Sequence, residues 1–288
     1  MGSEALAVEQ KAQSQTTHPK VVVVMPAFNA GRTLRLTYEA LPQDRPCHVI
    51  VVDDGSTDDT VEVARALGLE IFVHNKNYGY GANQKTCYIE ALKAGADIIV
   101  MVHPDYQYDP RLLPEMIEAI VQGRADIVLG SRLKGRRGFE TITEGMPWWK
   151  WVANRFLTMV ENRAFGLRLS EYHTGYRVYT REVLETCHFQ MNADGFIFDQ
   201  EIIAQAVAAG FRITETRVPV RYFPEASSAD FIDSCVYGAR ILMLVARYLL
   251  HHYRLLPSRQ FLLLKRRYRR IEAASVAHDS QRTPSQAP

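Results

Sequence analysis

Blocks of apolar residues, separated by mixed polar segments, recur along the first half of this chain. Residues 21–25 form a continuous apolar run that is mostly β-branched, and Pro26 ends it. Such runs are typical of strands buried on both faces of a parallel sheet. The same pattern predicts further strands at 48–52, 70–73, 97–102 and 126–129, with helices between them at 31–41, 58–67, 82–94 and 111–121. This alternation predicts an open α/β sheet with right-handed crossovers.

The second half of the chain is less regular. A Gly- and Arg-rich stretch at 134–144 is long enough to form a flexible lid. We expect strands at 175–179 and 212–220, and helices at 147–164, 197–209 and 229–256. The predicted organisation has four parts: a disordered N-terminus at 1–19, one α/β domain at 20–228, an amphipathic helix with a basic tail at 229–270, and a disordered C-terminus at 271–288.

The helix expected at 229–256 has two interpretations. Arg240, Arg247 and Arg254 recur every seven residues and therefore share one face, beside a broad apolar surface. This pattern fits a helix packed on the core with a solvated stripe, and it also fits a helix lying at a membrane interface. Phe-Leu-Leu-Leu at 261–264, followed by Lys-Arg-Arg-Tyr-Arg-Arg at 265–270, supports the interfacial interpretation. The uninterrupted apolar length is far below the about 20 residues needed to span a bilayer.

The charge balance favours an anionic surface as a partner. The 288 residues carry a net charge of +2, yet residues 254–270 hold seven basic and no acidic side chains, which leaves about −5 on the rest. Phospholipid headgroups and nucleic acid both attract such a tail. No recognised nucleic-acid-binding motif accompanies it, so lipid is the favoured partner and nucleic acid is not expected.

Cysteine usage and the N-terminus predict a cytoplasmic protein. The four cysteines lie far apart and form no Cys-x-x-Cys pair, so neither disulfides nor a zinc site are expected. The first 20 residues are polar and lack the apolar core of a signal peptide. Together with the basic tail, these features predict a protein that is peripheral at the inner face of the membrane.

Carboxylates follow two of the expected strands, at the edge where doubly wound sheets bind ligands. The sequence Asp-Asp-Gly-Ser-Thr-Asp at 53–58 begins where the second strand ends. Asp54 can accept hydrogen bonds from the base or ribose of a nucleoside, and Gly55 permits a sharp turn. The same residues would also suit a plain strand-to-helix turn with a good helix cap.

A second polar run, His-Pro-Asp-Tyr-Gln at 103–107, follows another strand. Asp105 and Gln107 offer hard oxygen ligands on one side of an extended segment, which predicts a Mg²⁺ or Mn²⁺ site completed by substrate phosphates. His103 either joins as a nitrogen ligand, which would favour Mn²⁺, or only contacts a phosphate or shapes the turn. Asp109 is expected to cap the next helix.

Arginines and a further acidic pair supply other candidates. Arg132 follows an expected strand, and it could clamp a phosphate in a bidentate way, as could Arg177 and Arg221. Asp199 and Glu201 lie at the start of the helix expected at 197–209. Acidic residues there most often interact with the helix dipole.

Taken in order, these motifs resemble those of family 2 glycosyltransferases. The subgroup that they most resemble is that of the dolichyl-phosphate mannosyltransferases and their bacterial polyprenyl-phosphate relatives, over about residues 20–230. The segments that carry the resemblance are Met-Pro-Ala-Phe-Asn at 25–29, Val-Asp-Asp-Gly-Ser-Thr-Asp at 52–58, Asp105 with Gln107, Gly-Ser-Arg at 130–132, Thr-Gly-Tyr-Arg at 174–177 and Val-Pro-Val at 218–220.

The resemblance implies a GT-A fold, a nucleotide-diphospho-sugar donor such as a UDP- or GDP-sugar, a divalent metal (Mg²⁺ or Mn²⁺) and inversion at the anomeric carbon. It further implies a role in cell-envelope glycan biosynthesis. By position, Asp105 and Gln107 would bind the metal, with His103 as a further ligand. The donor site would be formed by Pro26, Phe28, Asn29, Val52, Asp54, His103, Pro104, Asp105, Arg132, Arg177 and Arg221.

The chain departs from the family pattern in three places. His103 replaces the first aspartate of the family's Asp-x-Asp motif. Residues 221–228 lack the arginine and lysine of the family's Arg-x-x-Gly-x-Ser-Lys stretch, where Arg221 could substitute. No transmembrane helices are expected after the catalytic domain.

The acceptor decides which further residues the reaction needs. A lipid phosphate such as polyprenyl phosphate is already anionic and requires no base. A hydroxyl of a soluble or lipid-linked glycan must lose a proton, and Asp199 is the first candidate for that catalytic role, with Glu201 next.

Other classes of function make different demands on the loop after the first strand. A nucleotidyltransferase should show a Gly-rich loop with Arg and Lys, and a dinucleotide dehydrogenase should show Gly-x-Gly-x-x-Gly. Residues 26–31 read Pro-Ala-Phe-Asn-Ala-Gly and fit neither pattern. A non-catalytic nucleotide- or lipid-binding module remains as an alternative to the transferase.

Overall fold

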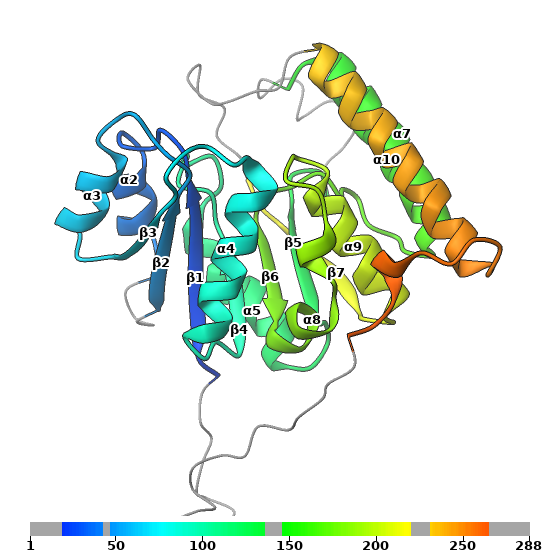
Figure 1. The fold of residues 1–288 in the computed structure, drawn as a ribbon, viewed down its shortest axis with the longest axis horizontal. Coiled ribbons are helices and arrows are strands. Elements are labelled where there is room, and N and C mark those ends of the chain that lie inside the picture. Colours follow the sequence, from blue (N-terminus) through cyan, green and yellow to red (C-terminus); the bar gives the residue numbers. More distant parts are fainter. Residues whose placement is uncertain (1–18, 43–46, 136–145, 220–230, 265–288) are drawn as a thin grey trace, which may run out of the picture.

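A single seven-stranded sheet forms the centre of the molecule, in a computed structural model that describes residues 19–42, 47–135, 146–219 and 231–264. The strand order is β3-β2-β1-β4-β6-β5-β7 (Figure 1). All strand pairs are parallel except the two that β6 makes with β4 and β5. The strands are β1 (Val21–Ala27), β2 (His48–Asp53), β3 (Glu70–Val73), β4 (Ile98–Met101), β5 (Ile127–Ser131), β6 (Arg177–Thr180) and β7 (Ile213–Arg217).

Helices cover both faces of this sheet and bury its apolar side chains in two layers. In β1, Val22 and Val24 belong to one core cluster, whereas Val23 and Met25 belong to the other. This split follows from the period of two along a strand. The cluster with Val23 includes α2 (Leu34–Glu39), α3 (Thr60–Ala66) and α5 (Leu113–Val121); the cluster with Val22 includes α4 (Tyr80–Lys93), α7 (Trp148–Phe165), α8 (Arg181–Thr186), α9 (Phe198–Ala208) and α10 (Phe231–His252).

The expected elements are confirmed by the structure, with small shifts at their ends. The mostly parallel α/β sheet is the predicted fold class. The helix expected at 31–41 is shorter, because residues 31–33 form a turn before α2. Asp109 does cap the next element, a short 3₁₀ helix at Pro110–Leu112, by accepting a bond from the Arg111 backbone N–H. The sequence pattern missed α8.

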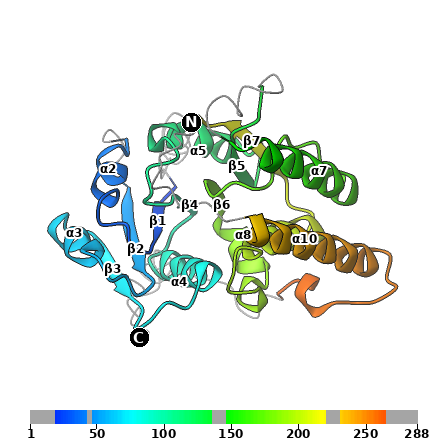
Figure 2. The same cartoon turned by 90° about the horizontal axis from the view of Figure 1, so that it is seen from above.

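The last long helix is packed on the core along one face. Helices α7 and α10 lie side by side and project together from the sheet (Figures 1 and 2). The inner face of α10 contributes Ile241, Leu244, Val245 and Tyr248 to the core. Its outer face leaves Val236, Met243 and Leu250 exposed. The core-packing interpretation is therefore correct for the inner face, and the described residues leave the outer apolar surface exposed.

The apolar run at 261–264 does not act as one unit. Phe261 is buried and packs edge-on against Tyr248, with ring centroids 5.8 Å apart. The prediction that Phe261 forms part of a membrane anchor is therefore wrong. Leu262, Leu263 and Leu264 are each about half exposed. No helix in the described ranges is long and apolar enough to cross a membrane.

Several predictions of the sequence lie outside the described residues. These are the disordered ends (apart from residue 19), most of the lid at 134–144, Arg221 and the basic run at 265–270.

Candidate active site

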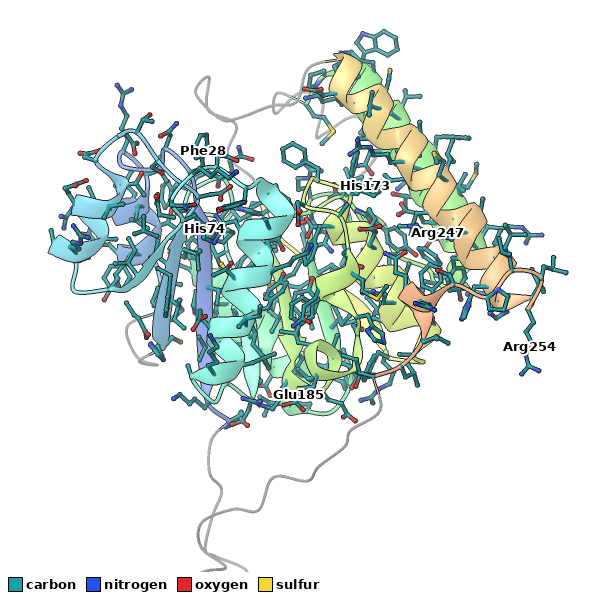
Figure 3. The ribbon with its side chains drawn as sticks, viewed as in Figure 1. Phe28, His74, His173, Glu185, Arg247 and Arg254 are labelled. Carbon is teal, nitrogen blue, oxygen red and sulfur yellow. The ribbon has the colours of Figure 1, made fainter. Side chains whose placement is uncertain are left out.

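The predicted site residues gather along the edge formed by the carboxyl ends of the parallel strands. Phe28 and Asn29 follow β1, Asp54 follows β2, and His103 and Asp105 come after β4. Figure 3 shows Phe28, His74 and His173 at this same edge. Because β6 is antiparallel, its first residues also lie there, which brings residues 173–177 to the site. This is where sheets of this kind bind ligands.

Asp54, the predicted contact for a nucleoside, also binds residues of its own chain at this edge. It is 2% exposed, and its Oδ1 accepts hydrogen bonds from His74 Nδ1 (2.7 Å) and the Tyr78 backbone N–H (3.0 Å). Its Oδ2 accepts from the Gly79 N–H at 2.9 Å. Asp54 therefore holds the segment that leads into α4. Contact with a nucleoside stays a prediction for this residue.

The turn after β2 requires Gly55, as predicted. Its φ is +74°, and a Cβ there would lie 2.7 Å from the carbonyl carbon of Lys76. Any other residue would strain the turn and push away the segment that Asp54 holds. Asp53 closes the turn by accepting a hydrogen bond from the Ser56 N–H at 3.0 Å.

The segment after β1 places an exposed aromatic ring beside this turn. Phe28 is 50% exposed. Asn29, with φ of 51°, donates its N–H to Ser56 Oγ (2.8 Å), and its Oδ1 accepts from the Thr57 N–H (2.9 Å). Phe28 therefore sits on a backbone tied to the turn that Asp53 and Gly55 form.

Two of the predicted donor contacts lie inside the sheet. Pro26 and Val52 are register partners in β1 and β2, and both are buried. Val52 has no exposed surface. Its side chain is part of the core cluster. The predicted contact of the Val52 side chain with a donor is therefore wrong.

A chain of polar contacts links α4 to the polar run after β4. Tyr80 Oη lies 3.0 Å from His103 Nε2 and donates a hydrogen bond to Asp199 Oδ2 at 2.7 Å. Tyr80 follows directly on the Gly79 N–H that Asp54 binds. The carboxylate after β2 and the imidazole after β4 are thus connected through residues 79–80.

Asp105 and His103 present the open ligand atoms of the site. Asp105 Oδ1 accepts the Gln107 N–H at 2.9 Å, a turn in which Tyr106 has φ of 57°. Neither Asp105 Oδ2 nor His103 Nδ1 has a hydrogen-bond partner among the residues whose positions are described. Burial raises the pKa of Asp105, against the opposing effect of His103, and burial lowers the pKa of His103. The charged form of such a partly buried carboxylate is stabilised by a nearby cation.

These residues fit a Mg²⁺ or Mn²⁺ ion whose remaining ligands are phosphates and water. The described ranges contain no cluster of three His, Cys, Asp or Glu side chains suited to a metal. Ions of this type take one or two carboxylates and leave other positions to the substrate. His103 and Asp105, two residues apart in the chain, each supply one open atom of suitable chemistry. Gln107 is a further predicted ligand.

Arg177 is enclosed in the protein core, contrary to its predicted contact with a phosphate. It has no exposed surface, and its Nε, Nη1 and Nη2 donate to the backbone oxygens of Thr174, Asp199 and Tyr172. Nη2 also lies 3.6 Å from Asp199 Oδ2. Burial opposes its charge, yet attraction to Asp199 raises the pKa of Arg177. The enclosed guanidinium instead links the segment before β6 to Asp199 on α9.

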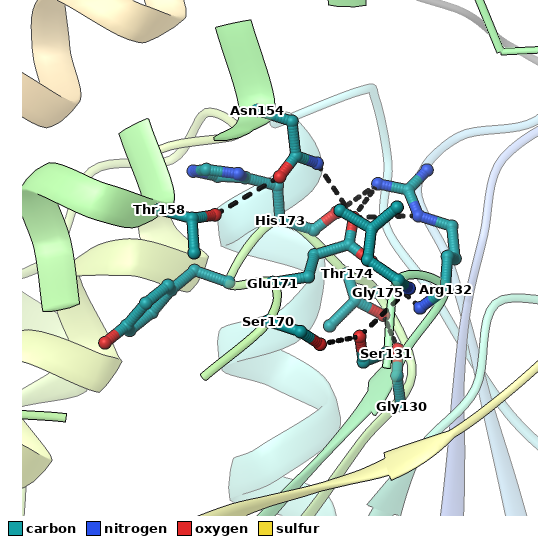
Figure 4. Close-up of polar contacts among 12 residues, drawn as sticks. Gly130, Ser131, Arg132, Asn154, Thr158, Ser170, Glu171, His173, Thr174 and Gly175 are labelled. Carbon is teal, nitrogen blue, oxygen red and sulfur yellow. Dashed lines mark hydrogen bonds and ion pairs between the residues drawn. The ribbon is translucent and has the colours of Figure 1, made fainter. Parts of the chain in front are cut away.

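Arg132 belongs to a buried network that Figure 4 shows in close-up. Its backbone N–H donates to Glu171 Oε2 (2.9 Å) and its Nε to Glu171 Oε1 (2.8 Å), while Nη2 donates to the His173 carbonyl (2.8 Å). Asn154 Nδ2, from α7, donates to the same Glu171 Oε1 at 2.9 Å. Glu171 is fully buried, so Arg132 neutralises a buried carboxylate. A phosphate contact of Arg132 stays a prediction.

Both candidate bases are engaged within the protein. Asp199 is 5% exposed; its Oδ2 binds Tyr80, and its Oδ1 is buried without a hydrogen-bond partner in the described ranges. Glu201 Oε2 accepts the Ala193 N–H (2.7 Å), and Oε1 bonds to Arg247 Nη2 at 3.2 Å. Both side chains are buried, with Glu201 6% exposed.

Sequence reasoning missed Tyr80, His74 and Glu171. Tyr80 and His74 have no motif of their own, and the carboxylates that they contact, Asp199 and Asp54, are 119 and 20 residues away in the chain. Glu171 lies only two residues before His173, within a stretch that the sequence pattern left unassigned.

Comparison with known proteins agrees with this geometry. A hexosyltransferase of low-salt glycan biosynthesis from Haloferax volcanii, Agl6, is 32% identical over 219 residues, which are 74% of this chain and 50% of that protein. The chain thus spans half the length of that relative. Polyprenol monophosphomannose synthase from Mycolicibacterium smegmatis is 27% identical over 70% of this chain and 77% of its own.

A solved structure shares the fold at low sequence identity. Glucosyl-3-phosphoglycerate synthase from Mycobacterium tuberculosis, in complex with Mn²⁺, UDP and glucosyl-3-phosphoglycerate, superposes with a TM-score of 0.58 at 17% identity. The match covers 81% of this chain and 80% of that one.

The mostly parallel sheet flanked by helices has the GT-A fold. Residues 22–187, more than half of the chain, match the glycosyl transferase family 2 domain, and the chain belongs to that family.

Proposed function

We propose that this glycosyltransferase moves a sugar from a nucleotide-diphospho-sugar to a lipid-linked phosphate, with inversion and with a divalent metal. The observation that carries the proposal is the pair of open ligand atoms, His103 Nδ1 and Asp105 Oδ2, at the ligand-binding edge of the sheet. The name of the Mycolicibacterium relative, polyprenol monophosphomannose synthase, supports the acceptor class.

The donor would lie along the edge from β2 to β4. Phe28 offers an exposed ring for a base, next to the turn that Asp54 fixes. His103, Asp105 and Gln107 would hold the metal, whose chemistry would be to offset charge on the departing diphosphate. Arg132 and Arg221 are the proposed phosphate contacts. Direct displacement by the acceptor oxygen, from the face opposite the leaving group, gives inversion.

The state of the candidate bases supports an acceptor that is already anionic. A sugar hydroxyl must give up a proton to a base within hydrogen-bond reach. Asp199 and Glu201 are buried and already bonded to Tyr80, Ala193 and Arg247. A phosphate oxygen attacks without a base, so the engaged carboxylates are no obstacle to that reaction.

Titration calorimetry and transfer assays test this function directly. With Mn²⁺ present, one sugar nucleotide from a panel of UDP-, GDP- and dTDP-sugars should bind, and omission of the metal should weaken binding by at least about tenfold. Polyprenyl phosphate should then accept the sugar, whereas the uncharged prenol should not. Transfer to the prenol or to a free glycan would reject the phosphate acceptor. No binding of any sugar nucleotide would favour a non-catalytic module.

The exposed apolar surface supports a membrane location for the acceptor. Trp148, Val152, Phe156 and Met159 are exposed along α7, spaced three or four residues apart and so on one face. Leu262–Leu264 stay exposed just before the basic run at 265–270. Exposed aliphatic and aromatic side chains beside cationic ones favour the interface of an anionic bilayer.

Liposome sedimentation tests the membrane contact. Replacing the five basic residues at 265–270 with glutamine should lower partitioning onto vesicles that contain one-third anionic lipid by 100-fold or more, because each basic residue near the surface contributes about 1 kcal/mol. A matched variant with Lys93 and Arg65 replaced, at the ends of α4 and α3, should partition like the parent. Equal partitioning of parent and tail variant would contradict the tail's role.

A further inference from the structure

The imidazole of His103 is held on both sides. The ring stacks on Tyr80 with centroids 5.3 Å apart and planes 22° from parallel. On another side it lies against the backbone of Gly175, where an added Cβ would be 2.5 Å from His103 Cδ2 and 2.8 Å from Nε2. The ring therefore has one packed orientation, and residue 175 must lack a side chain to permit it.

The hydrogen bonds to Tyr80 decide which ring nitrogen carries the proton. Tyr80 has a single hydroxyl hydrogen, and it donates that hydrogen to Asp199 Oδ2. An ionised carboxylate has no hydrogen to donate and acts only as an acceptor. Arg177, 3.6 Å from the same oxygen, keeps Asp199 paired with a positive charge. The contact of Tyr80 Oη with His103 Nε2 must then use an Nε2–H donor.

We propose that Tyr80 and Asp199 form a relay that fixes His103 as its Nε2–H tautomer, so that Nδ1 is the nitrogen ligand of the divalent cation. This inference rests on the proposed function for the presence of a cation. Tyr80 is a positioning residue, and Asp199 acts through it. The second ligand is Asp105, whose Oδ2 has no partner in the described part of the chain.

Metal-binding histidines commonly donate their other ring N–H to a carboxylate or another acceptor, which fixes the tautomer and the ring orientation. Here His103 contacts the hydroxyl of Tyr80, which in turn donates to the carboxylate of Asp199. A neutral nitrogen in place of a carboxylate also makes the site less negative and softer. Mn²⁺ gains more than Mg²⁺ from a nitrogen ligand, so the relay assigns this site a preference for Mn²⁺.

Nuclear magnetic resonance of the metal-free protein tests the tautomer. In the full chain labelled with ¹⁵N-histidine, long-range ¹H–¹⁵N correlations should show His103 protonated at Nε2, with assignment from a His103→Asn variant. In Tyr80→Phe, which keeps the ring but loses the hydroxyl, the population should shift toward a mixture of tautomers. A parent protein in which His103 carries its proton on Nδ1 would overturn the relay.

Pulsed electron paramagnetic resonance with Mn²⁺ and UDP tests the ligand. The parent should show coupling to a directly bound nitrogen that changes on ¹⁵N-histidine labelling, and His103→Asp should lose it. Tyr80→Phe should weaken Mn²⁺ binding by about 10-fold to 100-fold, the usual effect of losing an outer partner of a metal-bound histidine. His48→Ala is the matched control, because His48 pairs with Glu70 at the opposite end of β2 and β3.

The outcomes separate this inference from the proposed function. Mn²⁺ binding by the parent without nitrogen coupling would reject the relay and leave the transferase intact. No Mn²⁺ binding by the parent would reject the cation site and the metal dependence of the transferase together. The tautomer measurement contains neither metal nor donor, so it reports on the relay even in a chain that transfers no sugar.

Discussion

Replacing Asp105 with alanine should lower kcat/KM for sugar transfer by about 1,000-fold or more. Asp105 is the one carboxylate in the run at 103–107, and its Oδ2 is open. A metal that stabilises a leaving diphosphate contributes several kcal/mol to the transition state, and each 1.36 kcal/mol is a factor of ten in rate. Without this carboxylate the ion would keep only neutral protein ligands, His103 and Gln107.

Initial rates at saturating Mn²⁺, with circular dichroism to verify folding, measure this effect. Asp109→Asn provides the matched control, because Asp109 lies on the same loop but pairs with Arg111. That variant should keep a rate within a few-fold of the parent. Turnover of Asp105→Ala equal to that of the parent would remove Asp105 from the metal site and the metal from the proposed reaction.

The sequence predicted the fold well because its strands are buried on both faces. A strand such as β1, with Val22, Val23 and Val24 fully enclosed, must be apolar along its whole length, and that pattern is readable without knowing its neighbours. The helix α8 was missed because it has only six residues. A signal was present, since Thr180 caps α8 by accepting the Val183 N–H.

The sequence also located the edge of the sheet where the site lies, but it could not assign partners there. Asp54 and Asp105 follow strands, so their place was predictable from local pattern. Arg177 looked like a phosphate contact because its motif places it near the site. It is in fact buried, and its Nη1 donates to the backbone oxygen of Asp199 on α9, 22 residues along the chain. Contacts at such separation leave no periodic trace in a single sequence.

Tyr80 is a residue of the site that the sequence pattern could not reveal. It begins α4, where nothing in the local pattern distinguishes it from an ordinary helix residue. Its two partners are 23 and 119 residues away. The replacement of the family's first aspartate by His103 was visible in the sequence, whereas the hydroxyl that orients the histidine required the folded chain.

Replacing Arg132 with methionine should lower the free energy of unfolding by about 3–5 kcal/mol, because it leaves the buried carboxylate of Glu171 without a counter-charge. Methionine keeps most of the volume, so the loss reports the charge more than a cavity. Glu171 would retain hydrogen bonds from Asn154 Nδ2 and from the backbone N–H of residue 132, neither of which neutralises its charge. Urea denaturation followed by far-ultraviolet circular dichroism gives the change.

A double variant shows how much of that loss comes from leaving the Glu171 charge unpaired. Arg132→Met with Glu171→Met removes both buried charges, and replacing a buried ion pair by apolar residues is often neutral for stability. The double variant should therefore recover much of the stability lost by Arg132→Met alone.

Arg212→Met is the control. Arg212 pairs with Asp126 at 2.8 Å, but its side chain is 58% exposed, so a small effect is expected. If Arg132→Met were no more destabilising than Arg212→Met, the network would not hold α7 to the sheet through charge. The position of Arg132 at the end of β5 would then be better explained by a direct contact with the substrate.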